Sequence, residues 1–372
     1  MKRRIRYTVV GSGDNGKAMA GHLALMGYPV TLFDPDETCL GSVREQGGIR
    51  LTSTSRLGPS GIGVPRAITS RADAAIAEAQ IVMVTVSPQA HRHVARMLAP
   101  HVQNGQIVVL NPGYTCGAIE FAHVLREQGC TVDVTIAEAS TFVYSCCASG
   151  PCEAHIARVK DAIPLAALPA TRTSQVLEAL HPAYSQFIDG QSVLHTGLDN
   201  MGEVFHPALV LLNTGRIEST RGNYQFYIDG VTPRVARVLE ALDRERVAVA
   251  AVLGIRATMA LDWLQRAYDA QGSDLLDAIH SNPGYYDISA PASLEHRYIS
   301  DNVPLNMVPM AMLGRQYGVP VCTMEAVIDL ACIVRHTDYW HTGRTPGRLG
   351  LSAFSIDALM TCVMKTGFPP GI

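Results

Sequence analysis

Two stretches in the second half of the chain carry side chains that could transfer protons and bind a carboxylate. One is VFHPALVLLN, which contains His206, and the other is HRYISDNVP, which contains Arg297, Asp301 and Asn302. Histidine titrates near neutral pH, so His206 could act as a general acid or base. It could equally be a capping or core histidine, because residue type alone does not single out one of 13.

The neighbours of these residues indicate where they should lie. Pro207 follows His206, and proline suits the first turn of a helix, so we expect His206 at a helix entrance, facing a neighbouring domain. The planar guanidinium of Arg297 could hold a substrate carboxylate through two parallel hydrogen bonds. The alternative for Arg297 is a surface ion pair, for which Glu295 is the nearby partner.

The N-terminal segment VVGSGDNGKAMAGHLALMGYPVTLFD has the order of a dinucleotide-binding unit: strand, glycine loop, helix, strand, acid. Gly11, Gly13 and Gly16 form G-x-G-x-x-G, which lets a pyrophosphate approach backbone amides at the positive end of the helix. Asp34 comes 23 residues after Gly11, where a carboxylate binds the ribose hydroxyls and repels a 2′-phosphate. We therefore expect NAD as the cofactor in preference to NADP. The alternatives are a glycine turn without a ligand and Asp34 as a helix cap.

Other residues around this loop should also contact the cofactor. Asp14 would repel a phosphate unless it points away, so we expect it to be the N-cap of the helix. The segments TVSPQAH and LNPGYTCG follow strands, and doubly wound sheets bind ligands at the carboxyl ends of their strands, although prolines there can be simple turn residues. The expected cofactor-binding residues are Gly11, Ser12, Gly13, Asp14, Asn15, Gly16, Asp34, Ser87, Pro88, Gln89 and Asn111.

The elements that must position these residues alternate in type through the first half of the chain. The expected strands are RYTVVG, YPVTLFD, GIRLT, AQIVMVTVS, GQIVVLN and VDVTIAE. The expected helices are residues 17–26, 72–78, 90–98 and 117–127. Strands joined by crossover helices predict a mainly parallel, doubly wound Rossmann sheet. The runs HIARVK and AIPLAAL should add strands to the same sheet, before a helix near residues 174–180.

The strand pattern almost disappears after QFIDGQSVLH, and long amphipathic stretches follow. Thr232 with Pro233 predicts a helix start, and Gly254 and Gly318 predict helix ends. We therefore expect an NAD-binding Rossmann domain over residues 1–190 and an all-helical catalytic and substrate domain over residues 191–372.

The composition favours small-molecule substrates. With 372 residues, 47% hydrophobic and 17% charged, the chain can bury two cores, and its net charge of −3 makes nucleic acid or an anionic membrane a poor partner. No run reaches the ~18 apolar residues of a membrane span, and the apolar run YTVV after MKRRIR is too short for a secretory signal. The nine cysteines lack a disulfide framework and predict a cytoplasmic protein.

The cysteines Cys146, Cys147 and Cys152 form the one cluster that could suggest a metal or redox site. The cluster lacks a paired C-x-x-C and a histidine at zinc spacing. Buried thiols are common core residues, so we expect no metal.

In these motifs the chain resembles the opine dehydrogenase family, which includes octopine and nopaline dehydrogenases, and in particular its bacterial branch. The segments that carry the resemblance are, in order, GSGDNGKAMA, SPQAH, GQIVVLNPG followed by GAIEF, HTGLDNMGEVFHPALVLLNTGRIES, FYIDGVTP, SNPGYYDISAP and HRYISDNVP. They cover nearly the whole chain. The most specific part is HP followed by LLNTGRIES and later by RY.

The resemblance implies a Rossmann domain and a helical domain with the active site in the cleft between them. It implies that hydride from a nicotinamide reduces the imine formed by an amino acid and a 2-oxo acid such as pyruvate. In such enzymes the histidine of the HP element is the acid/base, and His206 occupies that position. Arg297 matches the carboxylate-binding arginine, Asn200 is a further expected substrate contact, and a homodimer is the expected assembly.

The chain departs from the family next to this arginine. The family usually has Glu and then Asp four and five residues after it, and the Asp partners the catalytic histidine, whereas this chain has Asp301 and Asn302. An amide can orient an imidazole but does not stabilise imidazolium as a carboxylate does. Either Asp301 takes over through a small loop shift, or His206 works with a lower pKa, or the activity has diverged; we rank these in that order.

Two other functions compete with an opine dehydrogenase. One is a related 2-oxo acid or hydroxy acid reductase, on the plan of the glycerol-phosphate and ketopantoate relatives, which typically use a catalytic lysine in the helical domain. No lysine occurs between Lys160 and Lys365, which disfavours that mechanism. The other is a catalytically impaired dinucleotide-binding protein, which Asn302 keeps open.

Overall fold

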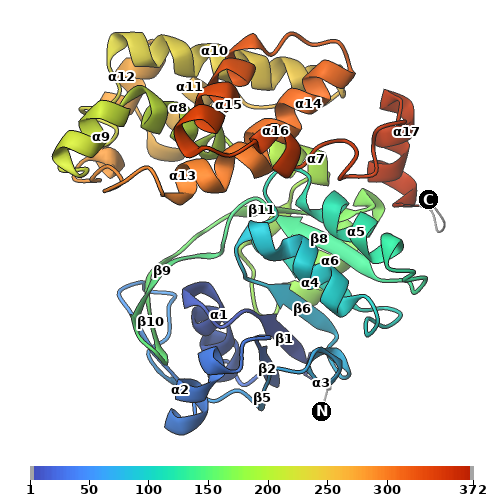
Figure 1. The fold of residues 1–372 in the computed structure, drawn as a ribbon. Coiled ribbons are helices and arrows are strands. Elements are labelled where there is room, and N and C mark those ends of the chain that lie inside the picture. Colours follow the sequence, from blue (N-terminus) through green and yellow to red (C-terminus); the bar gives the residue numbers. More distant parts are fainter. Residues whose placement is uncertain (1–3, 369–372) are drawn as a thin grey trace. The chain divides into compact units, whose positions relative to one another are not determined.

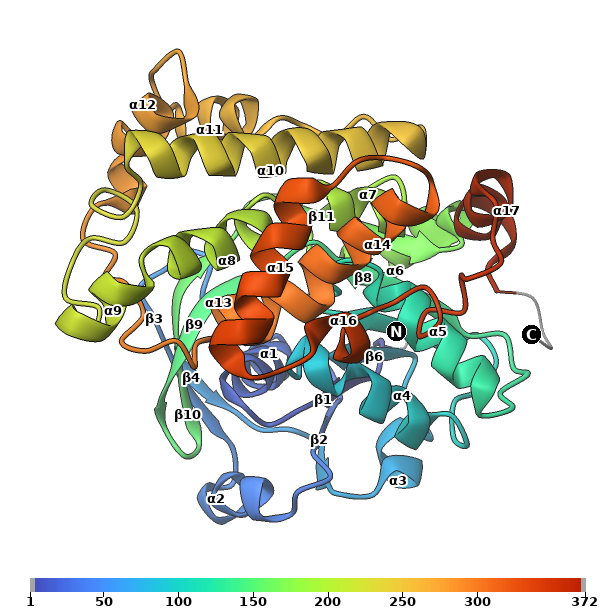
Figure 2. The same ribbon diagram turned by 45° about the horizontal axis from the view of Figure 1, so that its top comes forward.

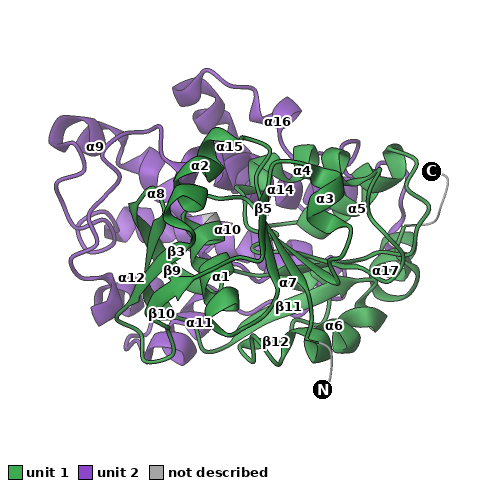
Figure 3. Ribbon diagram, turned by 90° about the horizontal axis from the view of Figure 1, so that it is seen from below, with its two compact units in different colours: residues 1–196, 357–372 green, residues 197–356 purple. Residues whose placement is uncertain are grey.

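The computed structural model describes residues 4–368, without the side chains of residues 203 and 204. Residues Met1–Thr196 with Asp357–Ile372 form one compact unit, and Gly197–Ile356 form a second (Figure 3). The units therefore differ from the predicted domains, 1–190 and 191–372, at the C-terminal segment. The division into a cofactor domain and a substrate domain stays a prediction.

The first unit is built on an eight-stranded sheet in the order β12-β11-β8-β7-β6-β1-β2-β5 (Figure 1). Its strands are β1 (Tyr7–Val10), β2 (Val30–Phe33), β5 (Ala67–Thr69), β6 (Ile81–Val84), β7 (Ile107–Leu110), β8 (Thr135–Ala139), β11 (Ile163–Leu168) and β12 (Phe187–Asp189). Neighbouring strands are parallel except β8 and β11. Strands β1, β6 and β7 are buried along their whole length, as in sheets covered on both faces. The predicted Rossmann sheet is confirmed.

The crossover helices of this unit lie close to their predicted ranges, except that the helix over residues 38–46 was not predicted. They are α1 (Asp14–Leu25), α2 (Thr38–Gln46), α3 (Ala72–Ile76), α4 (His91–Leu98), α5 (Gly117–Glu127) and α6 (Thr173–Leu180). Helix α4 packs against both α3 and α5, whereas α1 contacts β1 and β2 and also a second, smaller sheet. The C-terminal helix α17 (Ile356–Thr361) and the π-helix η5 (Cys362–Thr366) complete the unit, and η5 packs on β11.

The smaller sheet corrects one prediction. It has the order β4-β3-β10-β9, with β3 (Ile49–Ser53), β4 (Gly61–Gly63), β9 (Tyr144–Gly150) and β10 (Glu153–Val159). The runs GIRLT and HIARVK therefore belong to this sheet, whereas AIPLAAL does join the main sheet as β11. In β3 buried residues alternate with exposed or half-buried ones, because one face packs on α1; such a strand does not suit the doubly covered sheet.

The start of α1 corrects a second prediction. The N-cap is Gly13, whose backbone is extended, and Asp14 is already the first helical residue, with no side-chain capping bond. The Asp14 carboxylate is exposed in the first turn, where the helix dipole favours an acid. The expectation that Asp14 is the N-cap is wrong.

The second unit is helical. It contains the end of α7 (Val193–Leu198), then α8 (Gly202–Leu212), α9 (Thr214–Thr220), α10 (Pro233–Val252), α11 (Ala260–Tyr268), α12 (Leu275–His280), α13 (Arg297–Ser300), α14 (Val308–Gln316), α15 (Cys322–Arg335) and α16 (Tyr339–Thr342). The long helix α10 packs against α8, α12, α14 and α15 (Figure 2). Apart from one isolated bridge between Gln225 and Ser289, the described part of this unit has no strand. The predicted C-terminal helical domain is confirmed.

Three predicted helix boundaries in this unit are confirmed. Thr232 caps α10, because its Oγ1 accepts a hydrogen bond from the Val235 N–H at 3.4 Å. Gly254 and Gly318 follow the ends of α10 and α14 with φ of 71° and 75°, a left-handed conformation that glycine adopts without strain. Among residues 4–368 no helix is long and apolar enough to cross a membrane.

Candidate active site

The glycine loop between β1 and α1 brings backbone so close together that two of its glycines cannot be replaced. A Cβ on Gly16 would lie 1.8 Å from the carbonyl oxygen of Gly11, so the start of α1 and the loop could not keep this distance. Gly11 has φ of 104°, and its N–H donates to the Phe33 carbonyl at 2.8 Å. A Cβ on Gly13 would meet nothing within 4 Å. The loop is therefore closely packed where Gly11 meets Gly16, whereas the space next to Gly13 is open. This arrangement accepts a pyrophosphate.

Asp34 is connected to this loop by two hydrogen bonds. The N–H and the Oγ–H of Ser12 donate to its Oδ2 at 2.8 Å and 2.7 Å, and the Asp36 N–H donates to Oδ1 at 3.1 Å. The carboxylate is half-buried, and each of its oxygens has further acceptor capacity. An acid held beside the loop fits the two hydroxyls of an adenosine ribose and not a 2′-phosphate.

Strand β9 and the turn that follows it are fixed to α1. The buried Lys17 donates from Nζ to the carbonyls of Gly150 and Pro151 at 3.2 Å and 3.3 Å, and Cys146 Sγ donates to Asn15 Oδ1 at 3.3 Å. Burial, with the nearby Asp14 charge, raises the pKa of the Cys146 thiol to about 12. The thiol is therefore neutral and unreactive at neutral pH, so its contact with Asn15 is structural.

The other expected cofactor contacts gather at the carboxyl edge of neighbouring strands. Ser87 follows β6 and caps the turn η1 (Pro88–Ala90), where its Oγ accepts from the Gln89 N–H at 3.4 Å. Asn111 follows β7 and is fully buried, yet neither its Oδ1 nor its Nδ2 has a partner among the described residues. A buried amide without hydrogen bonds is costly, which marks Asn111 as a group that could bind a ligand.

His206 lies inside a helix, which corrects its expected place at a helix entrance. Helix α8 begins at Gly202, so His206 is in its second turn and Pro207 is a proline within the helix. Proline at this point removes one backbone hydrogen bond of the helix. The side chains of Pro207 and the following Ala208 and Leu209 are buried, so their packing offsets this loss.

Three side chains of the second unit surround the imidazole of His206. Its Nε2 is 2.8 Å from the Tyr227 hydroxyl, and its Nδ1 is 3.4 Å from Asn302 Nδ2. The Tyr298 ring stacks on it, with 4.0 Å between centroids and 16° between planes. Both nitrogens and one face of the ring are therefore held, so the imidazole has a single orientation.

Asn302, and not Asp301, is the residue that faces His206. Asn302 is 1% exposed and contacts Nδ1 of the imidazole. The carboxylate of Asp301 instead accepts from the Ser300 hydroxyl at 3.2 Å, and its charge acts on His296. The first of the three alternatives, in which Asp301 takes over, is wrong in this structure.

The environment of His206 favours its neutral form. Burial, followed by the positive charge of Arg297 and by His296, lowers the pKa of His206 to about 3. Asn302 supplies no negative charge that would counteract these effects. This direction agrees with the second alternative, a histidine with a lowered pKa.

Glu295, the surface partner considered for Arg297, forms a different ion pair. Glu295 pairs with Arg335, 2.5 Å from its Nη1, and not with Arg297. Arg297 begins α13, is exposed, and acts electrostatically on both His206 and His296. Asn200 lies in the connection between α7 and α8 and is half-buried.

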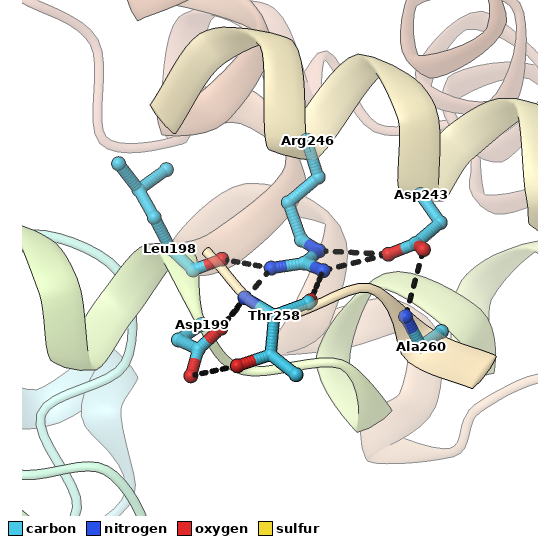
Figure 4. Close-up of polar contacts among 6 residues, drawn as sticks. All are labelled: Leu198, Asp199, Asp243, Arg246, Thr258 and Ala260. Atoms are coloured by element: carbon cyan, nitrogen blue, oxygen red, sulfur yellow. Dashed lines mark hydrogen bonds and ion pairs between the residues drawn. The ribbon is translucent and has the colours of Figure 1, made fainter. Parts of the chain in front are cut away.

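A buried ion network, which sequence reasoning missed, fixes this connection (Figure 4). Arg246 of α10 is fully buried and donates from Nε and Nη2 to Asp243 Oδ1 at 3.1 Å and 2.7 Å. It also donates from Nη1 to the Leu198 carbonyl at 2.6 Å and from Nη2 to the Thr258 carbonyl. The Thr258 N–H donates to Asp199 Oδ1 at 2.6 Å. Residues 198 and 199, just before Asn200 and α8, are thus tied to α10.

Comparisons with known proteins agree with this architecture. Residues 189–335 match the family described as NAD/NADP octopine/nopaline dehydrogenase, alpha-helical domain, and residues 6–110 match NADP oxidoreductase, coenzyme F420-dependent. The chain is 33% identical over 357 residues to the opine dehydrogenase of Arthrobacter sp. (strain 1C), which covers 96% of this chain and 98% of that protein.

Solved structures share the fold. Octopine dehydrogenase with NADH and L-arginine has a TM-score of 0.83 and 20% identity, and the match covers 96% of this chain and 98% of that one. A ketopantoate reductase from Ralstonia eutropha JMP134 has a TM-score of 0.61 and 16% identity, over 89% and 99% of the two chains. The fold is that of two-domain dehydrogenases with a Rossmann unit and a helical unit. The full-length similarity shows that the chain belongs to the opine dehydrogenase family.

Proposed function

We propose that the protein is an NADH-dependent opine dehydrogenase, which joins an amino acid to a 2-oxo acid such as pyruvate through reduction of their imine, reversibly. The observation that carries the proposal is the neutral, oriented imidazole of His206 within the electrostatic reach of Arg297. The reaction needs a group that moves protons at the substrate nitrogen and a cation that binds a carboxylate. His206 and Arg297 supply these two functions.

The cofactor would be held by the first unit. The tight loop at Gly11 and Gly16 and the acid Asp34 beside it support NAD in preference to NADP. The unpartnered amide of Asn111 supports a further contact there. We add as contacts the other predicted residues of this edge: Ser12, Gly13, Asp14, Asn15, Ser87, Pro88 and Gln89. When bound, the nicotinamide supplies the hydride.

Each catalytic side chain has a defined task in this proposal. The neutral imidazole of His206 takes a proton from the ammonium group of the amino acid, which must become an amine before it can attack the oxo acid. It returns the proton as the resulting carbinolamine loses water to form the imine. Asn302 orients the imidazole, Arg297 binds the carboxylate of a substrate, and Asn200 is a further substrate contact. Asp301 sets the charge around His296.

Two other activities would leave different kinetic signatures. A 2-oxo acid reductase would need no amino acid, and a dinucleotide-binding protein without turnover would need neither substrate. The neutral amide of Asn302 is the observation that favours the last of these. It removes the carboxylate that normally supports a catalytic histidine.

The test is NADH oxidation with pyruvate, with and without a panel of amino acids. Oxidation that requires both substrates supports the proposal, and oxidation with pyruvate alone supports the reductase. NADH binding without oxidation supports a dinucleotide-binding protein without turnover. His206→Ala should lower kcat by at least about 100-fold and change the Kd for NADH by less than about twofold. Turnover that survives in this variant would show that another group is the acid/base.

We further propose that the protein is cytoplasmic and forms a homodimer. The free thiols of all nine cysteines support a reducing compartment. The molar mass in solution tests the assembly: about twice the 40.0 kDa of the chain supports a dimer, and 40.0 kDa contradicts it.

A further inference from the structure

Tyr227 lies next to His206, and the proposed mechanism assigns it no role. It belongs to FYIDGVTP, in the turn between α9 and α10, and its side chain is half-buried. Its hydroxyl is 2.8 Å from Nε2, the imidazole nitrogen that Asn302 does not hold. A substrate therefore reaches the basic nitrogen of His206 either through this hydroxyl or by displacing it.

The hydrogen bonds of Asn302 decide which imidazole nitrogen carries the proton. As placed, Asn302 Nδ2 faces Nδ1 at a long 3.4 Å, and the buried Oδ1 has no partner in the described part of the chain. Amide oxygen and nitrogen are assigned by their hydrogen bonds, and a half-turn of this amide presents Oδ1 to Nδ1. The imidazole then donates from Nδ1 to Asn302, and the buried oxygen is satisfied. In this tautomer Nε2 is an acceptor, and the Tyr227 O–H is its donor.

The rings around Tyr227 hold its hydroxyl in this position. Tyr285 stacks on its ring with 4.1 Å between centroids, and Phe226 packs edge-on at 5.2 Å. Tyr298, which stacks on His206, shares a hydrogen bond with the Tyr227 hydroxyl. Burial, with the phenols of Tyr298, Tyr285 and Tyr268, raises the pKa of Tyr227 well above its usual value. The phenol therefore keeps its proton and can pass one on only while it receives another.

We propose that Tyr227 is a further catalytic residue, whose hydroxyl relays protons between the substrate nitrogen and Nε2 of His206. The relay rests on the proposed function, because it assigns a route to the same proton transfer. As the substrate ammonium gives a proton to the Tyr227 oxygen, the phenol gives its own proton to Nε2. One N–H and one O–H bond break, one O–H and one N–H bond form, the tyrosine is unchanged, and the imidazole becomes imidazolium. The reverse transfer returns the proton when water leaves.

The experiment compares Tyr227→Phe with Tyr285→Phe. The first removes the relay hydroxyl and keeps the ring. The second removes the hydroxyl of Tyr285, which stacks on Tyr227, whereas the ring that stacks on the imidazole is Tyr298. We expect Tyr227→Phe to lower kcat by about 100-fold and to keep the Kd for NADH within about twofold of wild type. In Tyr285→Phe both kcat and the Kd for NADH should stay within about threefold of wild type. Wild-type or higher kcat/KM in Tyr227→Phe would show that the substrate displaces the hydroxyl, and would overturn the relay. Equal losses in both variants would show a structural role only.

A second measurement needs no turnover, so it separates failure of the relay from failure of the proposed function. The ring nitrogens of His206 are titrated by NMR in the wild-type protein and in Tyr227→Phe. A phenol that donates to Nε2 stabilises the neutral imidazole, so Tyr227→Phe should raise the pKa of His206 by about half a unit or more. An unchanged pKa would remove the hydrogen bond on which the relay depends. If wild type oxidises no NADH but this shift is present, the proposed reaction fails while the Tyr227–His206 contact stands.

Discussion

At the residue that faces the imidazole of His206, this chain has an amide where the family resemblance leads one to expect a carboxylate. Asn302 can fix the orientation of His206 through Nδ1, as an aspartate would. It carries no charge and does not stabilise imidazolium as a carboxylate does, which leaves burial and Arg297 to lower the pKa of His206. Compared with the aspartate expected from the family, Asn302 thus preserves the orientation of the His206 imidazole but makes the imidazole a weaker base.

Asn302→Asp should reverse this loss. The new carboxylate favours imidazolium, so the pKa of His206 should rise from about 3 toward its usual 6.5. In the proposed mechanism the free base is the active form, so activity should be lost below the pKa, and the acidic limb of kcat/KM should move to higher pH. Above that limb, turnover should increase by about tenfold or more, since a carboxylate stabilises the charged intermediate state. The measurement is kcat/KM from about pH 4 to about pH 9.

The matched control is Asp301→Asn, which changes the adjacent carboxylate that does not face His206. It should leave the acidic limb where it is in wild type. A limb that moves in Asp301→Asn and not in Asn302→Asp would show that Asp301 partners the histidine during turnover.

Arg297 should connect substrate binding to the pKa of His206. Its charge is one cause of the low pKa, so a carboxylate that pairs with Arg297 should cancel this effect and raise the pKa. We expect saturating pyruvate to raise the pKa of His206 in an NMR titration. In Arg297→Gln the pKa should already be higher without pyruvate, and pyruvate should add no further change. A pyruvate-dependent shift that persists in the variant would place the carboxylate elsewhere.

At the scale of elements, local signals could be predicted from the sequence and distant pairings could not. Thr232 and Gly254 mark the ends of α10 because capping depends on a few adjacent residues. The strand β3 could be recognised by its alternation, but one of its two partners in the small sheet is the distant β10, with Arg50 opposite Glu153. Nothing within either segment specifies that pairing.

The candidate site divides in the same way. The glycine loop could be predicted because its strand, turn and helix are contiguous. The choice of His206 rested on a family motif, since its type and spacing fitted a capping histidine equally well. Tyr227 was missed because its contact with His206 depends on how α8 and the turn before α10 pack. The Asn302 contact likewise required the path of the chain after α13.

A substitution in the first turn of α1 tests whether NADH binding needs the close approach of the Gly11 and Gly16 backbones. Gly16→Ala should abolish NADH binding or weaken it by at least about tenfold, because its Cβ would overlap the Gly11 carbonyl and force the loop away from α1. Gly41→Ala in α2 is the control, since its Cβ would meet nothing within 4 Å. The control should bind NADH as wild type does and gain slightly in stability from its better helix propensity. Unchanged NADH titration of Gly16→Ala, followed by fluorescence, would contradict the role of the loop.

At the scale of the whole molecule, each compact unit has a hydrophobic core of its own. Around the main sheet the core is built on buried residues such as Val9, Met83 and Val109, and in the helical unit on Leu239, Val249 and Met310. The buried charges of the helical core include Arg246 and Asp243, which pair with each other, and also Arg344. Removal of one partner of a buried pair leaves the other charge unpaired and costs about 3–5 kcal/mol.

Arg246→Leu should therefore destabilise the second unit selectively. The variant leaves the Asp243 carboxylate without its cation and the Leu198 and Thr258 carbonyls without their donors, and all of these lie within residues 197–356. We expect thermal unfolding, followed by the helical circular dichroism signal, to show a new transition at lower temperature. The transition of the first unit should stay at its wild-type temperature. Arg237→Leu, at an exposed position of the same helix, should leave the curve unchanged. A single transition that moves as a whole in Arg246→Leu would show that the two units unfold together.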